Sequence, residues 1–269
     1  MPICSYAINF RVKQTKMSKI VTLDIENMGI LGWTWGLYEQ DIIHVEHQQH
    51  LLTIAWKWLD KTKVEVVSLL DNPKYKKEPH NDKVIAETIW PVLDYCDILI
   101  GHHIDAFDNK MMNSMFMRHH MNPPSSYRTV DTLKVARKYG KFTSNKLDDL
   151  GETFGIGRKL KHEGFPLWLG CDNGNTDSYK KMIKYNKQDV KLTEKLYKEL
   201  LPWIGNHPNL SIIDNKPNAC GRCGSSHFQF RGTYLTNSSI MQRVQCQNCG
   251  GWSRQRLADK ITKSRYVSI

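Results

Sequence analysis

Four acidic side chains lie in apolar surroundings at separate points of the chain. Asp24 and Glu26 are two residues apart in a β-rich run, so a strand there places both carboxylates on one face. Asp108 and Asp189 lie on the apolar stripes of two expected helices. Partly buried carboxylates that cluster repel one another unless divalent cations neutralise them, which indicates a hard-cation site. Two Mg²⁺ or Mn²⁺ ions about 4 Å apart suit in-line phosphoryl displacement, so the pattern predicts phosphodiester hydrolysis.

Each of these acids taken alone also fits a structural role. Asp24 and Glu26 can form a pair at a strand edge, and Asp108 can cap its helix. Asp189 can pair with a nearby lysine. Asp105 competes with Asp108 for the functional role, but it lies off the methionine stripe of the same helix. The helix face therefore favours Asp108, and the methionines are interpreted as core residues.

The elements that must position these acids follow an α/β pattern. Strands are expected over residues 20–26, 50–59, 63–70, 97–101 and 127–130. Helices are expected over residues 81–95, from 105 onward, and over 132–139, 147–154 and 177–201. Asn81 is the expected N-cap of the first helix, and residues 60–62 form the turn of a hairpin. Three strands followed by alternating helices and strands predict an α/β fold with a mixed central sheet flanked by helices.

Paired cysteines mark the C-terminal part of the chain. Four of the seven cysteines form two Cys-x-x-Cys pairs: Cys220, Cys223, Cys246 and Cys249. Each pair is followed by a glycine, which lets the backbone turn so that its amides face the thiolates. Strand-like alternation over residues 227–234 and 239–245 completes a predicted zinc ribbon, in which a structural Zn²⁺ supplies folding energy. Four free cysteines and an iron centre are the alternatives.

The other cysteines and the N-terminal residues bear on the compartment. Cys4, Cys96 and Cys171 are scattered, and an odd total argues against a secreted disulfide framework. Residues 1–16 lack the apolar core of a secretory signal, and Met17 is a second possible start. No apolar run approaches the roughly 18 residues of a membrane-spanning helix. We expect a cytoplasmic protein without a membrane partner.

Three short motifs carry a family resemblance: Asp24-Ile-Glu26, Gly101-His-His-Ile-Asp-Ala-Phe-Asp108 and Tyr185-Asn-Lys-Gln-Asp189. In this order they resemble the exonuclease motifs of the DEDD superfamily of 3′→5′ exonucleases, which have a ribonuclease H-like fold. The Tyr-x-x-x-Asp form of the third motif is similar to the Tyr variant, DEDDy. The wider pattern looks like a bacteriophage-type group of predicted exonucleases with a C-terminal zinc ribbon, which implies the host cytoplasm. The resemblance spans about residues 20–254 and includes Trp35-Gly, Asp131-Thr-Leu, Ser144-Asn-Lys-Leu-Asp, Leu167-Trp168 and Pro202-Trp203-Ile.

The resemblance implies a role for each motif residue. Asp24 would bridge two Mg²⁺ or Mn²⁺ ions. Glu26 and Asp189 would bind the ion that activates water, and Asp108 would hold the second ion. Tyr185, which shares a helix face with Asp189, would orient the attacking water.

Further substrate contacts are expected at two places in this part of the chain. The family usually has Asn five residues before the Asp of the second motif, where this chain has His103, and a substrate contact is expected there. Arg158, Lys159 and Lys161 form a basic loop near Gly155 and Gly157. That loop follows a helix rather than a strand, so it is interpreted as a contact to the substrate backbone rather than as a dinucleotide fingerprint.

The net charge of +11 is distributed unevenly along the chain. Residues 216–269 carry +8, residues 1–16 carry +3, and residues 17–215 sum to zero. The basic character suggests a polyanionic partner such as nucleic acid, with DNA favoured. Phosphate contacts and base stacking are expected from the ribbon residues Arg222, Arg231, Arg243 and Trp252. Alternatively, this surface docks a protein such as a polymerase or another replisome component.

Three histidines at intervals of three, His44, His47 and His50, suggest metal ligands. No acid or cysteine in the neighbouring sequence supports that interpretation, so a polar surface segment is preferred. Trp56 and Trp58 alternate on a strand and are expected in the core.

The expected organisation has five parts: an N-terminal extension over 1–16, a ribonuclease H-like exonuclease domain over 17–205, a linker over 206–218, a zinc ribbon over 219–257 and a basic tail over 258–269. The expected function is a metal-dependent 3′→5′ exonuclease that hydrolyses DNA by a two-metal mechanism. In this hypothesis the ribbon assists nucleic-acid or partner binding. An RNA-directed or structure-selective nuclease, and a non-catalytic nucleic-acid-binding or replisome adaptor, are the alternatives.

Overall fold

A computed structural model describes residues 17–38 and 40–256 of the chain. Two compact units are present: one comprises Lys19–His207, and the smaller one includes the residues from Pro208 onward together with Ser18. The expected N-terminal extension and basic tail lie outside the described residues. Within the described part of the chain, no helix combines the length and the apolar character that crossing a membrane requires.

The larger unit is built on a five-stranded sheet in the order β5-β4-β1-β6-β7. The strands are β1 (Ile20–Met28), β4 (His50–Trp58), β5 (Glu65–Ser68), β6 (Ile98–Gly101) and β7 (Arg128–Asp131). β4 pairs antiparallel with both β1 and β5, whereas β6 runs parallel to β1 and to β7. The mixed central sheet predicted from the sequence is therefore confirmed.

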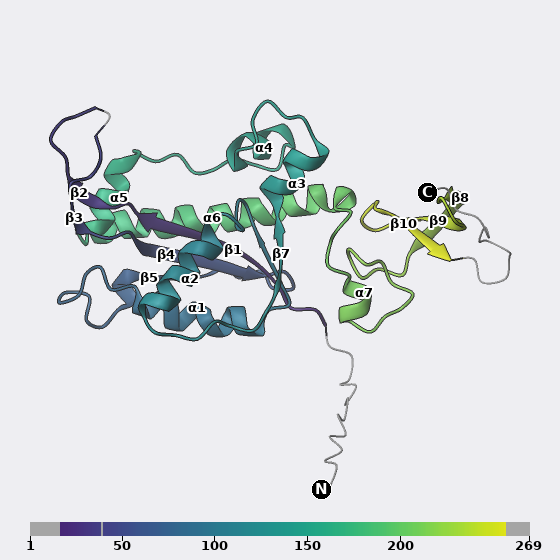
Figure 1. Ribbon diagram of the computed structural model, residues 1–269, viewed down its shortest axis with the longest axis horizontal. Coiled ribbons are helices and arrows are strands. Elements are labelled where there is room, and N and C mark those ends of the chain that lie inside the picture. The colour runs from purple at the N-terminus through teal and green to yellow at the C-terminus, as the bar shows by residue number, and fades with distance from the viewer. Residues whose placement is uncertain (1–16, 39, 257–269) are drawn as a thin grey trace, which may run out of the picture. The chain divides into compact units, whose positions relative to one another are not determined.

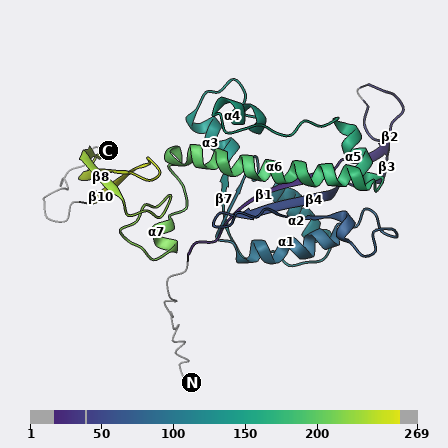
Figure 2. The same ribbon diagram turned by 180° about the vertical axis from the view of Figure 1, so that it is seen from behind.

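Helices cover both faces of this sheet, as Figures 1 and 2 show for α6 on one face and for α1 and α2 on the other. The helical segments are α1 (Lys83–Tyr95), α2 (Asp108–Arg118), α3 (Thr132–Tyr139), α4 (Leu147–Thr153), α5 (Phe165–Asp172) and α6 (Thr176–Leu200), with 3-10 turns η1 (Leu69–Asp71) and η2 (Leu201–Trp203). The α1 face holds the main hydrophobic core, which includes Leu23, Ile54 and Ile89. On the other face Val190 of α6 packs against Ala55 of β4. Strand alternation thus separates an apolar face from the face that carries the acids.

Three local features of this unit differ from the sequence-based expectation. Asp82, not Asn81, is the N-cap of α1, because the helix begins one residue later at Lys83. The Asn81 side chain instead accepts the backbone N–H of Lys83 at 3.1 Å. Helix α5 was not predicted, since a segment of eight residues is too short to show a helical period.

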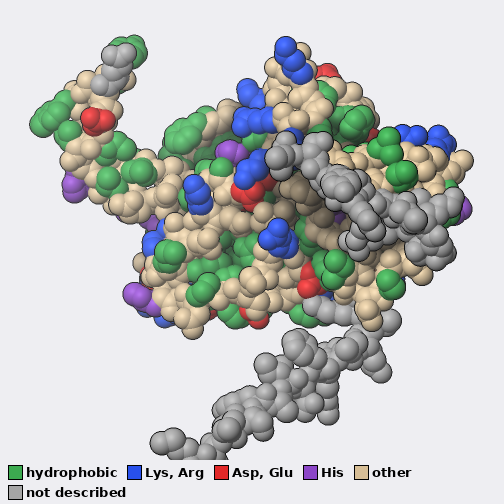
Figure 3. Space-filling model, turned by 45° about the vertical axis from the view of Figure 1, so that its right-hand side comes forward, with side chains coloured by type: hydrophobic (Ala, Val, Ile, Leu, Met, Phe, Trp, Pro, Cys, Tyr) green, Lys and Arg blue, Asp and Glu red, His purple; other side chains and the backbone are tan. Residues whose placement is uncertain are grey.

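The third unpredicted feature is a hairpin of β2 (Leu31–Trp33) and β3 (His44–His47). Its strands have only three and four residues, too few for a clear alternation. Trp35, Leu37 and Tyr38 in its loop are 86%, 92% and 83% exposed. Figure 3 shows apolar side chains in green along this projecting hairpin. Residues 29–47 contain no lysine or arginine but three acids, so the hairpin combines exposed apolar side chains with negative charge.

The smaller unit is a three-stranded antiparallel sheet preceded by a short helix. The strands are β8 (Phe228–Leu235), β9 (Ile240–Cys246) and β10 (Trp252–Arg256), in the order β10-β9-β8. β8 and β9 match the expected strands, and β10 was not predicted. Helix α7 (Leu210–Ile213) lies in the segment expected to be a linker. Leu210 is buried and its N–H donates to the carbonyl of Gly221 at 2.8 Å, so this segment is part of the unit.

Candidate active site

Asp24 and Glu26 project from β1 toward helix α6. Their cross-strand partners in β4 are Ala55 and Thr53, and Ala55 packs against Val190 of α6. The register therefore places both carboxylates on the face that packs against α6. Their alternation along the strand predicted that they share a face.

A third acid of the predicted motifs joins them from α6. Carboxylate oxygens of Asp24, Glu26 and Asp189 lie within 4.8 Å of one another. Asp189 is fully buried, and Asp108, the first residue of α2, is 5% exposed. Asp108 is close enough for its charge to raise the pKa of Asp24. Asp105, the competitor on the same segment, instead pairs with Lys134 at 2.7 Å.

Burial raises the pKa of all four carboxyl groups. The pKa of Asp24 lies well above its usual range because of burial and, next, the charges of Glu26 and Asp189. Burial, supplemented by the charge of Asp189, raises the pKa of Glu26 to about 8. Burial raises the pKa of Asp108 to about 7. The cluster holds more negative charge than its protein surroundings neutralise, which is the condition that divalent cations relieve.

Lys159 is the cation that contacts this cluster in the described structure. Its ammonium lies 2.6 Å from Asp189 Oδ2 and donates to the Tyr185 hydroxyl at 2.9 Å. Burial lowers the pKa of Lys159, but the charges of Asp189 and Tyr185 outweigh it, and the pKa lies above its ordinary value. Lys159 was predicted to contact substrate from a basic loop. That contact stays a prediction, and the loop brings the ammonium to Asp189 of the acid cluster. Asp148 Oδ1 accepts the backbone N–H of Lys159 at 2.7 Å.

Tyr185 lies one helical turn before Asp189 in α6 and is 7% exposed. Its ring lies edge-on to His162 and Trp168, with centroids 4.9 and 6.2 Å away. Burial, followed by the charge of Asp189, raises the pKa of Tyr185 to about 12. The hydroxyl therefore keeps its proton at neutral pH and can donate a hydrogen bond.

Asn186 is a positioning residue that was not assigned a role from the sequence. Its Nδ2 donates to Asp24 Oδ2 at 2.7 Å, and its Oδ1 accepts from Thr53 Oγ1 at 3.1 Å. Asn186 is fully buried, so these two hydrogen bonds fix the orientation of the Asp24 carboxylate. The sequence offered one sign of this role: Asn186 is a polar amide on the apolar stripe of the helix, three residues before Asp189.

Three further residues were predicted to contact substrate near this cluster: Arg158, Lys161 and His103. Arg158 is bound by Asp148 and Glu152, both at 2.7 Å, rather than by the four acids. Lys161 is exposed. His103 is exposed with φ of 71°, and its N–H donates to Asp131 Oδ1 at 3.0 Å. His103 lies in the loop between β6 and α2, and its contact with substrate stays a prediction.

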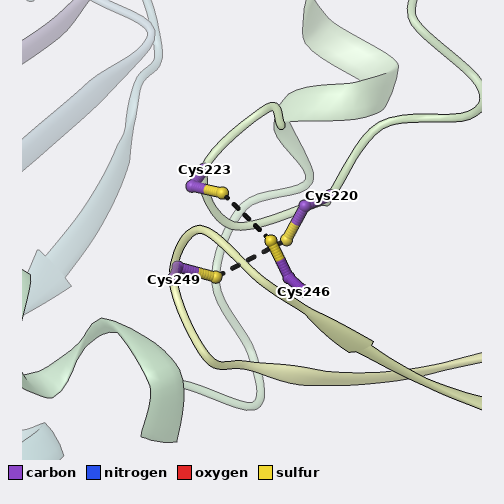
Figure 4. A group of neighbouring side chains, drawn as sticks. All are labelled: Cys220, Cys223, Cys246 and Cys249. Atoms are coloured by element: carbon purple, nitrogen blue, oxygen red, sulfur yellow. Dashed lines mark hydrogen bonds between the residues drawn. The ribbon is translucent and has the colours of Figure 1, made fainter. Parts of the chain in front are cut away.

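The four paired cysteines form a second centre, in the smaller unit. Figure 4 shows their thiols facing one another across the centre. The Sγ atoms of Cys220 and Cys249 are 3.7 Å apart, and those of Cys223 and Cys246 are 3.6 Å apart. Tetrahedral Zn–S bonds of about 2.3 Å require sulfur–sulfur distances of roughly 3.8 Å, so the four thiols fit a zinc ion.

The glycines after each pair have the backbone conformation that their position requires. Gly224 and Gly250 have φ of 72° and 73°, in the left-handed region that glycine adopts without strain. Their N–H groups donate to the carbonyls of Cys220 and Cys246 at 2.8 and 2.9 Å. These turns close the two knuckles as predicted from the sequence.

The arginines and tryptophan predicted to bind nucleic acid lie together on the ribbon. The guanidinium of Arg243 lies 5.3 Å from the ring centroid of Trp252. Arg222 donates to the Trp252 carbonyl at 2.9 Å, and Arg243 donates to the Arg231 carbonyl at 2.8 Å. The four residues are therefore close neighbours in the smaller unit.

Comparison with known proteins gives one family match. The family model of the RNase H superfamily matches residues 41–201, a range that contains Asp108 and Asp189 and begins after Asp24 and Glu26. No curated protein matches the chain. Among solved structures, the chain is similar to the family B DNA polymerase from the hyperthermophilic archaeon Pyrobaculum calidifontis, with 13% identity and a TM-score of 0.49. The match covers 82% of this chain and 31% of the polymerase chain, so the chain spans about a third of that protein.

Proposed function

Because the chain belongs to the RNase H superfamily, we propose that it is a metal-dependent nuclease of the DEDDy type that hydrolyses DNA from the 3′ end. One observation carries the proposal: acids from two elements, β1 and α6, bring their oxygens within 4.8 Å of one another. A tyrosine stands one turn from the acid of α6, as in the third motif of that group.

The donor set fits divalent cations of the Mg²⁺ and Mn²⁺ class. The cluster offers only carboxylate oxygens, which hard cations prefer, and burial raises the pKa values of those carboxyl groups. Asp24 would contribute to both ions, Glu26 and Asp189 to one, and Asp108 to the other. Bound ions would supply an activated water and would neutralise the charge that develops on the leaving oxygen.

The protein's own side chains orient the reactants. Asn186, held by Thr53, keeps the Asp24 carboxylate in one orientation. The protonated Tyr185 hydroxyl donates a hydrogen bond that can orient the attacking water, and its ring is held by His162 and Trp168. Lys159, whose side chain is 32% exposed, neutralises Asp189 and can reach a phosphate oxygen of the substrate.

The smaller unit would support this activity through binding. A structural Zn²⁺ held by the four cysteines would stabilise the ribbon, which has few buried apolar residues of its own. The surface of Arg222, Arg231, Arg243 and Trp252 would contact phosphates and bases of the substrate. Docking of a polymerase or replisome protein on this surface is the alternative outcome.

The test compares two variants on the same helix. Asp189→Asn removes a buried acid of the cluster, whereas Asp177→Asn removes an acid whose side chain is 81% exposed. Both are incubated with 5′-labelled single- and double-stranded DNA and RNA in Mg²⁺ or Mn²⁺. We expect shortening from the 3′ end of DNA, a loss of about two to three orders of magnitude in Asp189→Asn, and no change in Asp177→Asn.

Each other outcome assigns a different function. Faster degradation of RNA than of DNA would make the chain an RNA-directed nuclease. Tight DNA binding without turnover in Mn²⁺ would support a non-catalytic adaptor. Equal activity of Asp189→Asn and the wild type, or activity that a chelator does not affect, would refute the metal-dependent site.

A further inference from the structure

Three side chains that are far apart in the sequence meet at the edge of the larger unit, outside the acid cluster. His50 is the first residue of β4, His80 lies in the loop before α1, and Asp172 is the last residue of α5. Nε2 of His50 and Nε2 of His80 lie 3.3 and 3.5 Å from the same oxygen, Oδ1 of Asp172. One ligand atom from each residue lies within 4.8 Å of the others.

The protonation pattern of His50 directs a lone pair into this cluster. Its Nδ1 lies 3.2 Å from the carbonyl of Gln48, which can only accept, so Nδ1 carries a proton. Nε2 then points toward Asp172 Oδ1. His50 is 3% exposed, and neither its Nε2 nor Asp172 Oδ1 has a hydrogen-bond partner within the described residues.

Two unsatisfied buried polar atoms side by side require an explanation. A metal-binding histidine usually donates the N–H of one ring nitrogen to a backbone carbonyl or a carboxylate. Its other ring nitrogen then carries the lone pair that binds the metal. Zn–N and Zn–O bonds of about 2.0–2.2 Å in a tetrahedron separate neighbouring ligand atoms by roughly 3.3–3.5 Å. The separations of 3.3 and 3.5 Å between the histidine Nε2 atoms and Asp172 Oδ1 agree with this geometry.

We propose that His50, His80 and Asp172 bind a Zn²⁺ ion, separate from the zinc of the cysteine centre and from the cations of the acid cluster. Two imidazoles and one carboxylate form a borderline donor set that suits Zn²⁺ better than Mg²⁺. The ring of His47 lies beside that of His80, with the two centroids 4.3 Å apart. His80 has a side-chain exposure of 27%, which gives the ion access from solvent.

The proposed ion would fasten three elements that the chain connects only through loops. It would tie the end of α5 to the start of β4 and to the loop before α1. α5 also carries Trp168, whose ring contacts Tyr185 and whose side chain hydrogen bonds to Glu26. The site is therefore a structural zinc that holds the helix adjoining the acid cluster.

The test is the zinc content of the full-length chain. The protein is saturated with Zn²⁺, exchanged into buffer with a large excess of Mg²⁺ to occupy the acid cluster, and assayed by elemental analysis. We expect two zinc equivalents in the wild type and one fewer in Asp172→Asn, which preserves the side-chain volume, and in His80→Gln, which alters a partly exposed residue. His44→Gln is the matched control, because His44 is an exposed histidine of the neighbouring β3, and it should keep the wild-type content.

Two further measurements make the outcome decisive. Glu26→Gln should retain both zinc ions. If this variant loses a zinc ion that Asp172→Asn keeps, that ion belongs to the acid cluster, and the proposal is overturned. In the Co²⁺-substituted protein, Asp172→Asn and His80→Gln should lose the part of the visible absorption that the histidine site contributes. The visible and charge-transfer bands of the cysteine centre should remain. Unchanged zinc content and unchanged Co²⁺ spectra in both folded variants would show that His50 and Asp172 form a metal-free ion pair.

Discussion

Replacing Glu26 by glutamine is expected to stabilise the metal-free protein at alkaline pH. Burial, supplemented by the charge of Asp189, raises the pKa of Glu26 from 4.5 to about 8. Below about pH 4.5 the carboxyl group is protonated in both the folded and the unfolded chain, so it carries no penalty. As the pH rises toward 8, the unfolded chain releases the proton more readily, and the metal-free folded protein loses stability relative to it.

The size of this penalty follows from the two pKa values. A change in pKa from 4.5 to about 8 corresponds to an unfavourable free energy on the order of 5 kcal/mol above pH 8. Because the Glu26 side chain keeps some contact with solvent, we expect about 1–3 kcal/mol to be observed. For a unit of this size, about 2–4 °C per kcal/mol gives a rise in Tm of roughly 2–12 °C in Glu26→Gln.

The assay is thermal unfolding in chelator at pH 5 and at pH 8.5, followed by titration with Mg²⁺ or Mn²⁺. The wild type should lose Tm between the two pH values and regain it when a cation binds, whereas Glu26→Gln should depend less on both. Glu87→Gln is the control, because Glu87 is 60% exposed and pairs with Lys83 on the surface of α1. If Glu26→Gln in chelator is no more stable than the wild type at pH 8.5, the acids do not repel one another as argued, and the cation site loses its physical basis.

Three further variants test separate parts of the two units. Tyr185→Phe keeps the ring contacts and removes the hydroxyl, so kcat should fall by about 10²–10³-fold with KM and Tm little changed, measured by steady-state kinetics; an unchanged kcat would remove the hydroxyl from the reaction. Lys159→Met removes the ammonium that occupies the cluster, so calorimetry should show tighter Mn²⁺ binding even as turnover falls, and weaker binding would contradict the competition between ammonium and cation. Cys249→Ser should release the zinc of the cysteine centre and expose the ribbon to limited proteolysis, while the melting of the 19–207 unit stays that of the wild type; a ribbon that resists protease without zinc would refute the structural role of the metal.

The elements that carry the acids could be predicted because their periods are long and regular. β1 alternates apolar and polar residues from Val21 to Glu26, and α6 carries its apolar stripe along a helix of twenty-five residues. The faces of Asp24, Glu26 and Asp189 therefore followed from spacing. The turns at the cysteine pairs could be predicted because a glycine follows each pair. Gly224 and Gly250 adopt the left-handed backbone conformation there.

The remaining features depend on contacts between distant segments. Lys159 contacts Asp189 because of the path that its loop follows. The spacing of residues within the loop does not predict that path. The histidine pattern at 44, 47 and 50 suggested a polar surface, yet His50 is buried beside His80 and Asp172, which are 30 and 122 positions away along the chain. Short elements such as α5 and the β2–β3 hairpin lack the length over which a period becomes visible.

The hairpin formed by β2 and β3 gives the protein a surface whose response to ionic strength is opposite to that of the ribbon. Added salt screens the contacts of arginines with phosphates, so the proposed nucleic-acid binding through Arg222, Arg231 and Arg243 would weaken as salt rises. Apolar side chains such as Trp35 and Leu37, without nearby lysine or arginine, associate more strongly as salting-out ions are added. A salt series therefore separates the two surfaces without a single mutation: contacts made by the ribbon dissociate, and contacts made by the hairpin persist or strengthen.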